Sequence, residues 1–220
     1  MDMFARLLDM VRTPPRRIPS VMAPIVMNES EDKDDVSVTP IARAATDALF
    51  EARTVLIFGE VNTALARSVT SQLVALASKS DAPIRVLVNS PGGHVESGDT
   101  IHDVIKAITP EVIMIGTGWV ASAGALVYVA AKKKNRYALP NTRFLLHQPL
   151  GGAGGAQSDI EIEATQILLM RERLNGIFAK ATGQDHAKIL RETERNLWIP
   201  AQEACAYGLV HRVIESLSDV

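Results

Sequence analysis

The sequence predicts an α/β fold built around a mostly parallel sheet. Between residues 54 and 131, three short apolar runs, each rich in β-branched residues, are each followed by a helical pattern. Right-handed crossovers make such strands parallel, and binding sites form where the strands end. A chain of 220 residues is long enough for one domain with a substantial core and short for two.

The first half of the chain is predicted to alternate between helices and strands. Asn62 is expected to cap the second helix, and Gly116 and Gly118 are expected to end the third strand. The expected elements are a helix over 42–51, a strand over 54–59, a helix over 62–78, a strand over 84–88, a helix over 94–108, a strand over 112–115 and a buried helix from Ser122.

The second half contains the longest predicted helix. Ser158 and Glu161 form the pattern of a capping box, and Gly183 is a typical stop signal. About 25 helical residues span nearly 40 Å, so this helix is expected either to project and pair with another subunit or to lie along the sheet. The other expected elements are strands over 136–139 and 143–147, helices over 185–196 and 201–207, and a strand over 211–215.

Composition excludes several classes of function. A net charge of −2 without a basic stripe argues against nucleic-acid binding. A single cysteine, Cys205, excludes a disulfide framework and favours an intracellular protein, and the spacing of the five histidines predicts no metal site. The uncharged run 112–131, followed by three lysines, is compatible with a membrane span. Its internal glycines favour a core strand and helix instead, so no membrane association is expected.

Ser122 is the candidate nucleophile. At a helix start, free backbone N–H groups and the positive end of the helix dipole favour an alkoxide. The alternative is that Ser122 is one more small residue that allows the helix to pack closely. His147 closes a predicted strand, and Gly92 and Gly93 follow a neighbouring one. A serine and a histidine with nearby oxyanion donors are the elements of acyl-transfer chemistry.

Five segments resemble the proteolytic subunits of the Clp protease, the ClpP family. They are SPGG at 90–93, ASAGA at 121–125, ALPNTR at 138–143, HQPLGGAGGAQSDIEIEA at 147–164 and EACAYGLV at 203–210. The resemblance, which begins near Val55, implies a ClpP/crotonase-like fold of stacked βα units. It implies one protease domain over residues 41–220 with a handle at about 148–183. Residues 1–40 are then an N-terminal extension and axial segment, mobile or removed by processing.

The resemblance also assigns site residues. Ser122 becomes the nucleophile of a serine endopeptidase and His147 the general base, and the backbone N–H groups of Gly93 and Ala123 form the oxyanion hole. The residues that flank an extended peptide substrate are Gly92, Val95, Pro149, Leu150 and Gly151.

Partners follow from the same resemblance. Two seven-membered rings of the chain would stack through the long helix and enclose the active sites, where unfolded polypeptides are hydrolysed. An AAA+ unfoldase would bind the ATP, so the chain itself is expected to need no cofactor. The expected location is the cytoplasm.

Three features depart from the family pattern. Asn196 stands where the triad aspartate is usual, which predicts a slow or conditionally active protease. Arg85 lies on a strand that lacks the aromatic residues on which the unfoldase usually docks, which predicts reliance on a second ClpP-type subunit. Ala123 replaces a larger apolar residue, which predicts a roomier specificity pocket.

Three other functions fit parts of the pattern. A crotonase-type acyl-CoA enzyme shares the glycine turn and the sheet. A serine–lysine peptidase would use Lys132, Lys133 or Lys134 as its base. A mainly structural or regulatory subunit, activated by a second subunit, would explain the asparagine at position 196.

Overall fold

The computed structural model describes residues 40–152 and 154–220. Apart from Pro40, the predicted N-terminal extension lies outside the described residues. In chain order the elements are α2 (Pro40–Glu51), β1 (Thr54–Phe58), α3 (Thr63–Lys79), β2 (Ile84–Ser90), α4 (Val95–Ala107), β3 (Val112–Ala121), α5 (Ala123–Tyr128), η1 (Lys133–Asn135), β4 (Arg136–Ala138), β5 (Arg143–Leu146), α6 (Gln157–Thr182), α7 (His186–Glu192), β6 (Leu197–Pro200), α8 (Ala201–Tyr207), β7 (Arg212–Val213) and η2 (Leu217–Asp219).

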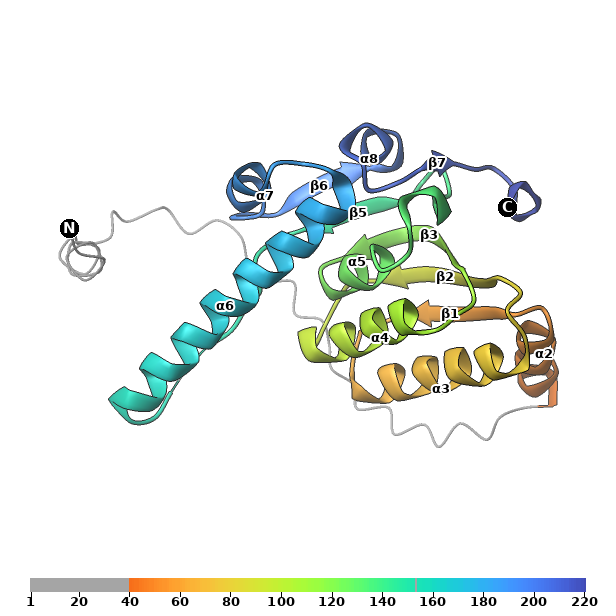
Figure 1. Cartoon of the computed structure of the whole chain (residues 1–220), viewed down its shortest axis with the longest axis horizontal. Coiled ribbons are helices and arrows are strands. Elements are labelled where there is room, and N and C mark those ends of the chain that lie inside the picture. Colours follow the sequence, from red (N-terminus) through yellow and green to blue (C-terminus); the bar gives the residue numbers. More distant parts are fainter. Residues whose placement is uncertain (1–39, 153) are drawn as a thin grey trace. The chain divides into compact units, whose positions relative to one another are not determined.

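The sheet is mostly parallel, as predicted. Strands β1, β2, β3, β4 and β7 follow one another in that order and are all parallel. Strand β5 runs parallel to the end of β3, and β6 pairs with β5 in the antiparallel direction. Helices α3, α4 and α5 lie side by side next to the strands (Figure 1).

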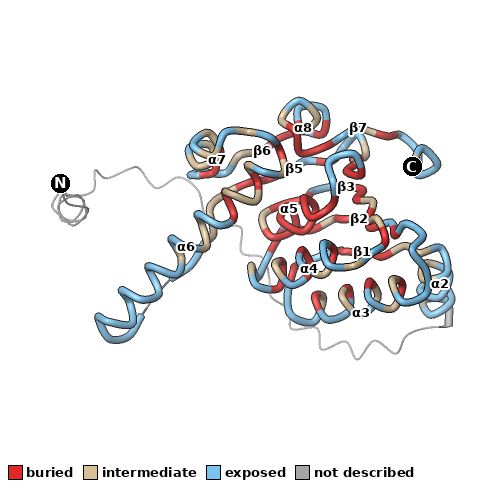
Figure 2. Tube along the Cα trace, in the orientation of Figure 1, coloured by how far each residue is buried: buried red, intermediate tan, exposed pale blue. Residues whose placement is uncertain are grey.

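Alternation of side chains along the strands creates the core. Val55 and Ile57 on β1 are fully buried, as are every second residue of β2 from Ile84 to Ser90. The rings of Tyr128 and Phe144 extend this core toward β5, with their centroids 5.1 Å apart. Burial concentrates in the strands and in α5 (Figure 2).

The expectation that Gly116 and Gly118 end the third strand is wrong, because β3 continues through both glycines to Ala121. A β-carbon at Gly116 would lie 3.1 Å from Thr142 Cγ2, and Thr142 Oγ1 donates to the Gly116 carbonyl at 2.8 Å. Gly118 has φ +61 and lies against the Asn89 side chain. The glycines therefore bend the strand instead of ending it, and β3 changes its neighbour from β4 to β5 across this bend.

Helix α5 is short. It begins directly after Ser122, as predicted, but ends at Tyr128 after 6 residues. The following segment, Val129 to Ala131, remains buried without being helical. The apolar density of this stretch therefore reflects burial of the chain and not the length of a helix.

Helix α6 is the 26-residue helix expected for the handle, and it ends at Gly183, which has φ +78. Its first ten residues are exposed, its buried residues begin at Leu174, and it extends away from the sheet (Figures 1 and 2). Arg173 fastens α6 to α4 through two hydrogen bonds to the Asp99 carboxylate, at 2.5 and 2.7 Å. The projection is thus confirmed, and pairing with another subunit stays a prediction.

The capping box expected at Ser158 is wrong. The N-cap is Ala156, which has no capping side chain, and the Glu161 side chain instead accepts a hydrogen bond from Gln157 Nε2 at 3.1 Å. The N-cap therefore lies two residues before Ser158, the residue that the polar signal indicates.

The region after α6 differs from the predicted helix over 185–196. Helix α7 is capped by Asp185 and ends at Glu192, so Asn196 lies outside it. The next residues form β6, a strand that the sequence analysis did not predict. The buried Thr193 hydroxyl donates to the Ile189 carbonyl at 2.8 Å and to Asn175 Oδ1 at 3.1 Å, which turns the chain toward β5.

Candidate functional site

Ser122 occupies a strained turn between β3 and α5. Its backbone angles are φ 52 and ψ −119, and it is one of two described residues other than glycine with positive φ. Such a conformation costs about 1–3 kcal/mol and persists only where its surroundings hold it. Here the Ser122 N–H donates to the Leu145 carbonyl on β5 at 2.9 Å. A sharp strand-to-helix turn of this kind exposes a serine hydroxyl at the end of a sheet.

Gly92 and Gly93 lie beside this serine, as the parallel arrangement of β2 and β3 predicts. A β-carbon at Gly92 would be 2.6 Å from Ser122 Cβ, and one at Gly93 would be 2.4 Å from the Val61 carbonyl oxygen. The loop is fixed by hydrogen bonds from Val61 N–H to the Gly92 carbonyl and from His94 N–H to the Val61 carbonyl, both 2.7 Å. Only glycine fits at either position.

Two backbone N–H groups near Ser122 are available to an oxyanion. Within the described chain, neither the Gly93 N–H nor the Ala123 N–H is paired with a protein acceptor. Ala123 is the first residue of α5, where N–H groups have no partner within the helix. Stabilisation of a developing oxyanion needs donors that are free in this way.

Pairing between β5 and β6 brings His147 to Asn196. Leu146 is opposite Leu197 in this antiparallel pair. His147, which follows β5, therefore lies opposite Asn196, which precedes β6. Gln148 links the segment after β5 to the segment before β6. Its N–H donates to the Thr193 carbonyl at 2.7 Å, and its side chain donates to the Glu194 carbonyl at 3.0 Å.

Two opposing influences set the basicity of His147. Partial burial lowers the pKa of the imidazole below its usual value of 6.5, and a side-chain hydrogen bond with Asn196 raises it. A hydrogen bond that raises the pKa favours the protonated imidazolium over the neutral ring. Burial dominates, and the neutral, proton-accepting form of His147 therefore persists to lower pH than in a free histidine.

One pocket joins Ser122 and His147. It also contains Val95, Ala123 and Pro149, while Leu150 is 83% exposed and Gly151 lies against Ile167 of α6. The remaining lining residues are Leu126, Leu146, Leu174 and Phe178. The sequence analysis assigned no role in the site to Leu174 and Phe178, which lie on α6. No local signal relates them to the site.

The pocket volume is about 20 Å³, close to the space that one water molecule needs. The roomier pocket expected from the small side chain of Ala123 stays a prediction, because that expectation compares this pocket with those of relatives. The Ala123 side chain is 3% exposed and approaches Gly98 on α4, so the helix packs closely where the side chain is small.

Gly92→Ala is expected to reduce peptide hydrolysis by about 100-fold or more, because the methyl group would displace Ser122 by about 1 Å. The free energy of unfolding should fall by about 1–3 kcal/mol, since φ is +102 and the space is filled. Hydrolysis of a fluorogenic peptide and denaturant unfolding measure the two effects. Gly152→Ala is the matched control, because nothing lies within 4 Å of that position. Full activity in Gly92→Ala would contradict the tight approach.

The serine–lysine alternative is wrong. Lys132 and Lys134 form ion pairs with Glu111 at 2.9 and 3.0 Å, and Glu111 immediately precedes β3 whereas Ser122 follows its far end. These contacts lower the pKa of Glu111 to about 2.

Among the described residues, no three His, Cys, Asp or Glu side chains gather as a metal site. No helix within 40–152 and 154–220 has the length and apolar character of a membrane span.

Comparison with known proteins identifies the family. Residues 40–217 match the Clp protease family. The chain belongs to this family. ATP-dependent Clp protease proteolytic subunit 3 of Rhizobium etli is 56% identical over 194 residues, which cover 88% of this chain and 100% of that protein. Proteolytic subunit 2 of Gluconobacter oxydans is 53% identical over 216 residues, which cover 97% of this chain and 96% of that one.

Solved Clp protease structures share the fold. ClpP1 of Listeria monocytogenes has a TM-score of 0.72 and 50% identity, with 80% of this chain and 98% of that chain covered. An asparagine-to-aspartate mutant of it has a TM-score of 0.74 and 51% identity, with 79% and 98% covered. The ClpP fold and the family predicted from sequence are confirmed, and the chain is a Clp-type proteolytic subunit and serine endopeptidase. The crotonase alternative is not favoured. The likeness also extends upstream of Val55, where it was expected to be weak.

Proposed function

We propose that Ser122, His147 and Asn196 are the triad with which this Clp proteolytic subunit cleaves peptide bonds. The observation that carries the proposal is one pocket at the ends of β3 and β5 that contains Ser122 and His147, with Asn196 hydrogen-bonded to the imidazole. The strained turn at Ser122 supports the role of nucleophile, since strain at a non-glycine residue concentrates at functional sites.

In the proposed mechanism, the Ser122 oxygen attacks the carbonyl carbon of the scissile peptide while its proton passes to His147. The carbonyl oxygen becomes negative and is stabilised by the N–H groups of Gly93 and Ala123. His147 then gives the proton to the leaving amine, the C–N bond breaks, and an ester on Ser122 remains. Water, deprotonated by His147, hydrolyses the ester. Asn196 accepts the other imidazole N–H and so orients the ring, but it contributes no negative charge.

The proposed substrate is an unfolded polypeptide bound in an extended conformation. Gly92 and Val95 on one side and Pro149, Leu150 and Gly151 on the other would pair with its backbone as neighbouring strands. A pocket of about 20 Å³ beside Ser122 suits recognition of backbone more than of large side chains. No cofactor is proposed for the chain itself.

The proposed assembly is a pair of stacked seven-membered rings in the cytoplasm, joined through α6. Four large apolar side chains on the exposed part of α6 support an interface there, since apolar surface of this extent is normally covered. They are Ile160, Ile162, Leu168 and Leu169, which are 41–62% exposed.

A second ClpP-type subunit is proposed for docking of the AAA+ unfoldase. The side chain of Arg85 is exposed on β2 and donates to the Val220 carbonyl at 2.8 Å, so a charge tied to the C-terminal residue stands on the strand where an apolar anchor is usual. Loss of apolar contact area at such an anchor weakens binding substantially.

A fluorophosphonate probe is expected to modify Ser122 in the folded protein, with the adduct located by mass spectrometry. Denatured protein treated with the same probe serves as the control, because an activated serine requires the folded site. Labelling only after addition of a second subunit would support conditional activation. No labelling in any assembly would contradict the proposed triad and favour a structural subunit.

A further inference from the structure

A second, strongly basic pocket lies away from the proposed catalytic site. Its volume is about 340 Å³, and it is bounded by the last turn of α4, the segment after α5, the start of β4 and the last turn of α6. Five basic side chains line it together with His102. They are Lys106, Lys132, Lys133, Arg136 and Lys180.

Arg136 is the unusual member of this group, because it is 1% exposed. Its Nη2 donates to the Ala181 carbonyl at 2.6 Å and to the Gly208 carbonyl at 3.4 Å. Its Nε and Nη1 are buried and have no partner among the described residues. Leaving buried guanidinium donors unpaired costs free energy. An acceptor that bound to Arg136 would therefore stabilise the folded protein.

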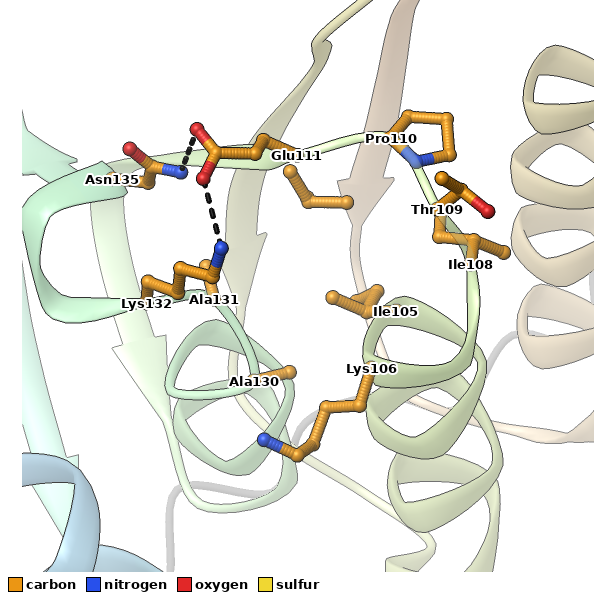
Figure 3. A pocket seen from close by; sticks show the side chains of 11 residues that line it. Ile105, Lys106, Ile108, Thr109, Pro110, Glu111, Ala130, Ala131, Lys132 and Asn135 are labelled. Carbon is orange, nitrogen blue, oxygen red and sulfur yellow. Dashed lines mark hydrogen bonds and ion pairs between the residues drawn. The ribbon is translucent and has the colours of Figure 1, made fainter. Parts of the chain in front are cut away.

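Few acidic side chains offset the charge. Lys132 is paired with Glu111, as Figure 3 shows, and His102 contacts Asp103 at 2.9 Å. No carboxylate of the described chain pairs with Lys106, Lys133 or Lys180. Lys106 extends from α4 toward the segment that contains Ala130. Both residues also line the neighbouring pocket drawn in Figure 3.

Helix dipoles explain part of the basic character. Lys106 and Lys180 stand in the last turns of α4 and α6, where cations stabilise the negative helix ends. Each helix end carries only about half a negative charge. With two carboxylates added, five cations still leave the pocket positive, and neither Lys133 nor the unpaired atoms of Arg136 are explained by a helix end.

We propose that this pocket binds a phosphoanhydride chain, with Arg136 at its base and the lysines around its rim. The unpaired Nε and Nη1 of Arg136 can donate to separate phosphate oxygens, and lysines supply charge that adapts to a chain of phosphates. A volume of about 340 Å³ is at the lower end of small-ligand sites. The chain can come from an inorganic oligophosphate or from a nucleotide, and both contain the same linkage.

The test is calorimetric titration of the assembled protein with inorganic triphosphate, and separately with ATP, at fixed ionic strength without magnesium. We expect saturable binding of one triphosphate per subunit, with affinity that falls as salt rises. A concentration 100-fold above Kd should raise the unfolding midpoint by about 5–10 °C. Equal affinity for triphosphate and ATP assigns the site to the phosphates alone, and tighter binding of ATP assigns it to a nucleotide.

The double variant Lys133→Ala/Lys180→Ala should weaken binding at least tenfold without disturbing the fold, because Lys180 is exposed and neither lysine makes an ion pair with the described residues. Lys79→Ala is the matched control, since Lys79 stands in the last turn of α3 outside this pocket. Equal binding by the double variant and the wild type would overturn the proposal, as would no binding at 10 mM, well above the range of a specific site. Binding by dissociated protomers alone would also overturn it, by placing the pocket in an interface between copies.

Discussion

Replacing Ser122 by alanine is expected to lower kcat for peptide hydrolysis on the order of 10⁵-fold, because the nucleophile of the acyl transfer is lost. The fall is measured best in an Asn196→Asp background, where the starting rate is high enough to leave a wide range. The protein should remain folded, since alanine preserves the packing of α5 and the backbone hydrogen bond to Leu145.

The control for this variant is Ser78→Ala, because Ser78 is an exposed serine on α3 that bonds only within its own helix. Its rate should equal that of the parent protein. Hydrolysis that persists in Ser122→Ala at the parent rate would show that another residue, or another protein in the sample, performs the reaction.

Asn196→Asp is expected to raise kcat by on the order of 10²-fold or more. A carboxylate stabilises the imidazolium that forms on His147, which a neutral amide does less well, and in chymotrypsin the opposite change costs about 10⁴ in kcat. The substitution changes no side-chain size. Initial rates with a fluorogenic peptide measure it.

The pH profile distinguishes this explanation from a general improvement in folding. Catalysis needs neutral His147, so activity is lost as pH falls through its pKa, which burial holds below 6.5 in the wild type. An aspartate raises that pKa, so the acidic limb of kcat/KM should move to higher pH in Asn196→Asp. Asn196→Ala removes the acceptor and should move the limb to lower pH with a lower rate. An unchanged rate and an unchanged limb in Asn196→Asp would mean that Asn196 does not orient His147.

The parts of the site that local patterns predict are those at the ends of regular elements. Ser122 and Gly92 each follow a strand with a clear apolar run, and His147 directly follows β5, so the parallel sheet brings them together. Asn196 was assigned by resemblance alone. Its position depends on β6, a strand of four residues that contains Pro200 and is stabilised by pairing with a distant segment.

The errors in the predicted elements have a common origin in packing. Gly116 and Gly118 are typical strand breakers, yet close approach of Thr142 and Asn89 makes them part of β3. Ser158 offers a good cap, but α6 starts at Gln157 without one. Leu174 and Phe178 face Ser122 only because α6 crosses near α5, a relation that no local window contains.

Beyond the bend at Gly118, β3 keeps one register pair with β2, Val120 with Ser90, and otherwise pairs with β5. The strand beyond the bend is hydrogen-bonded to β5, which in turn holds β6, so the serine, the histidine and the asparagine are carried on one small ribbon of three strands. The oxyanion loop after β2 is carried by the neighbouring strand. A shift of that ribbon would leave the imidazole and the amide in contact with each other while moving the hydroxyl away from Gly93. Such a shift would inactivate the protease while the contact between His147 and Asn196 stayed intact.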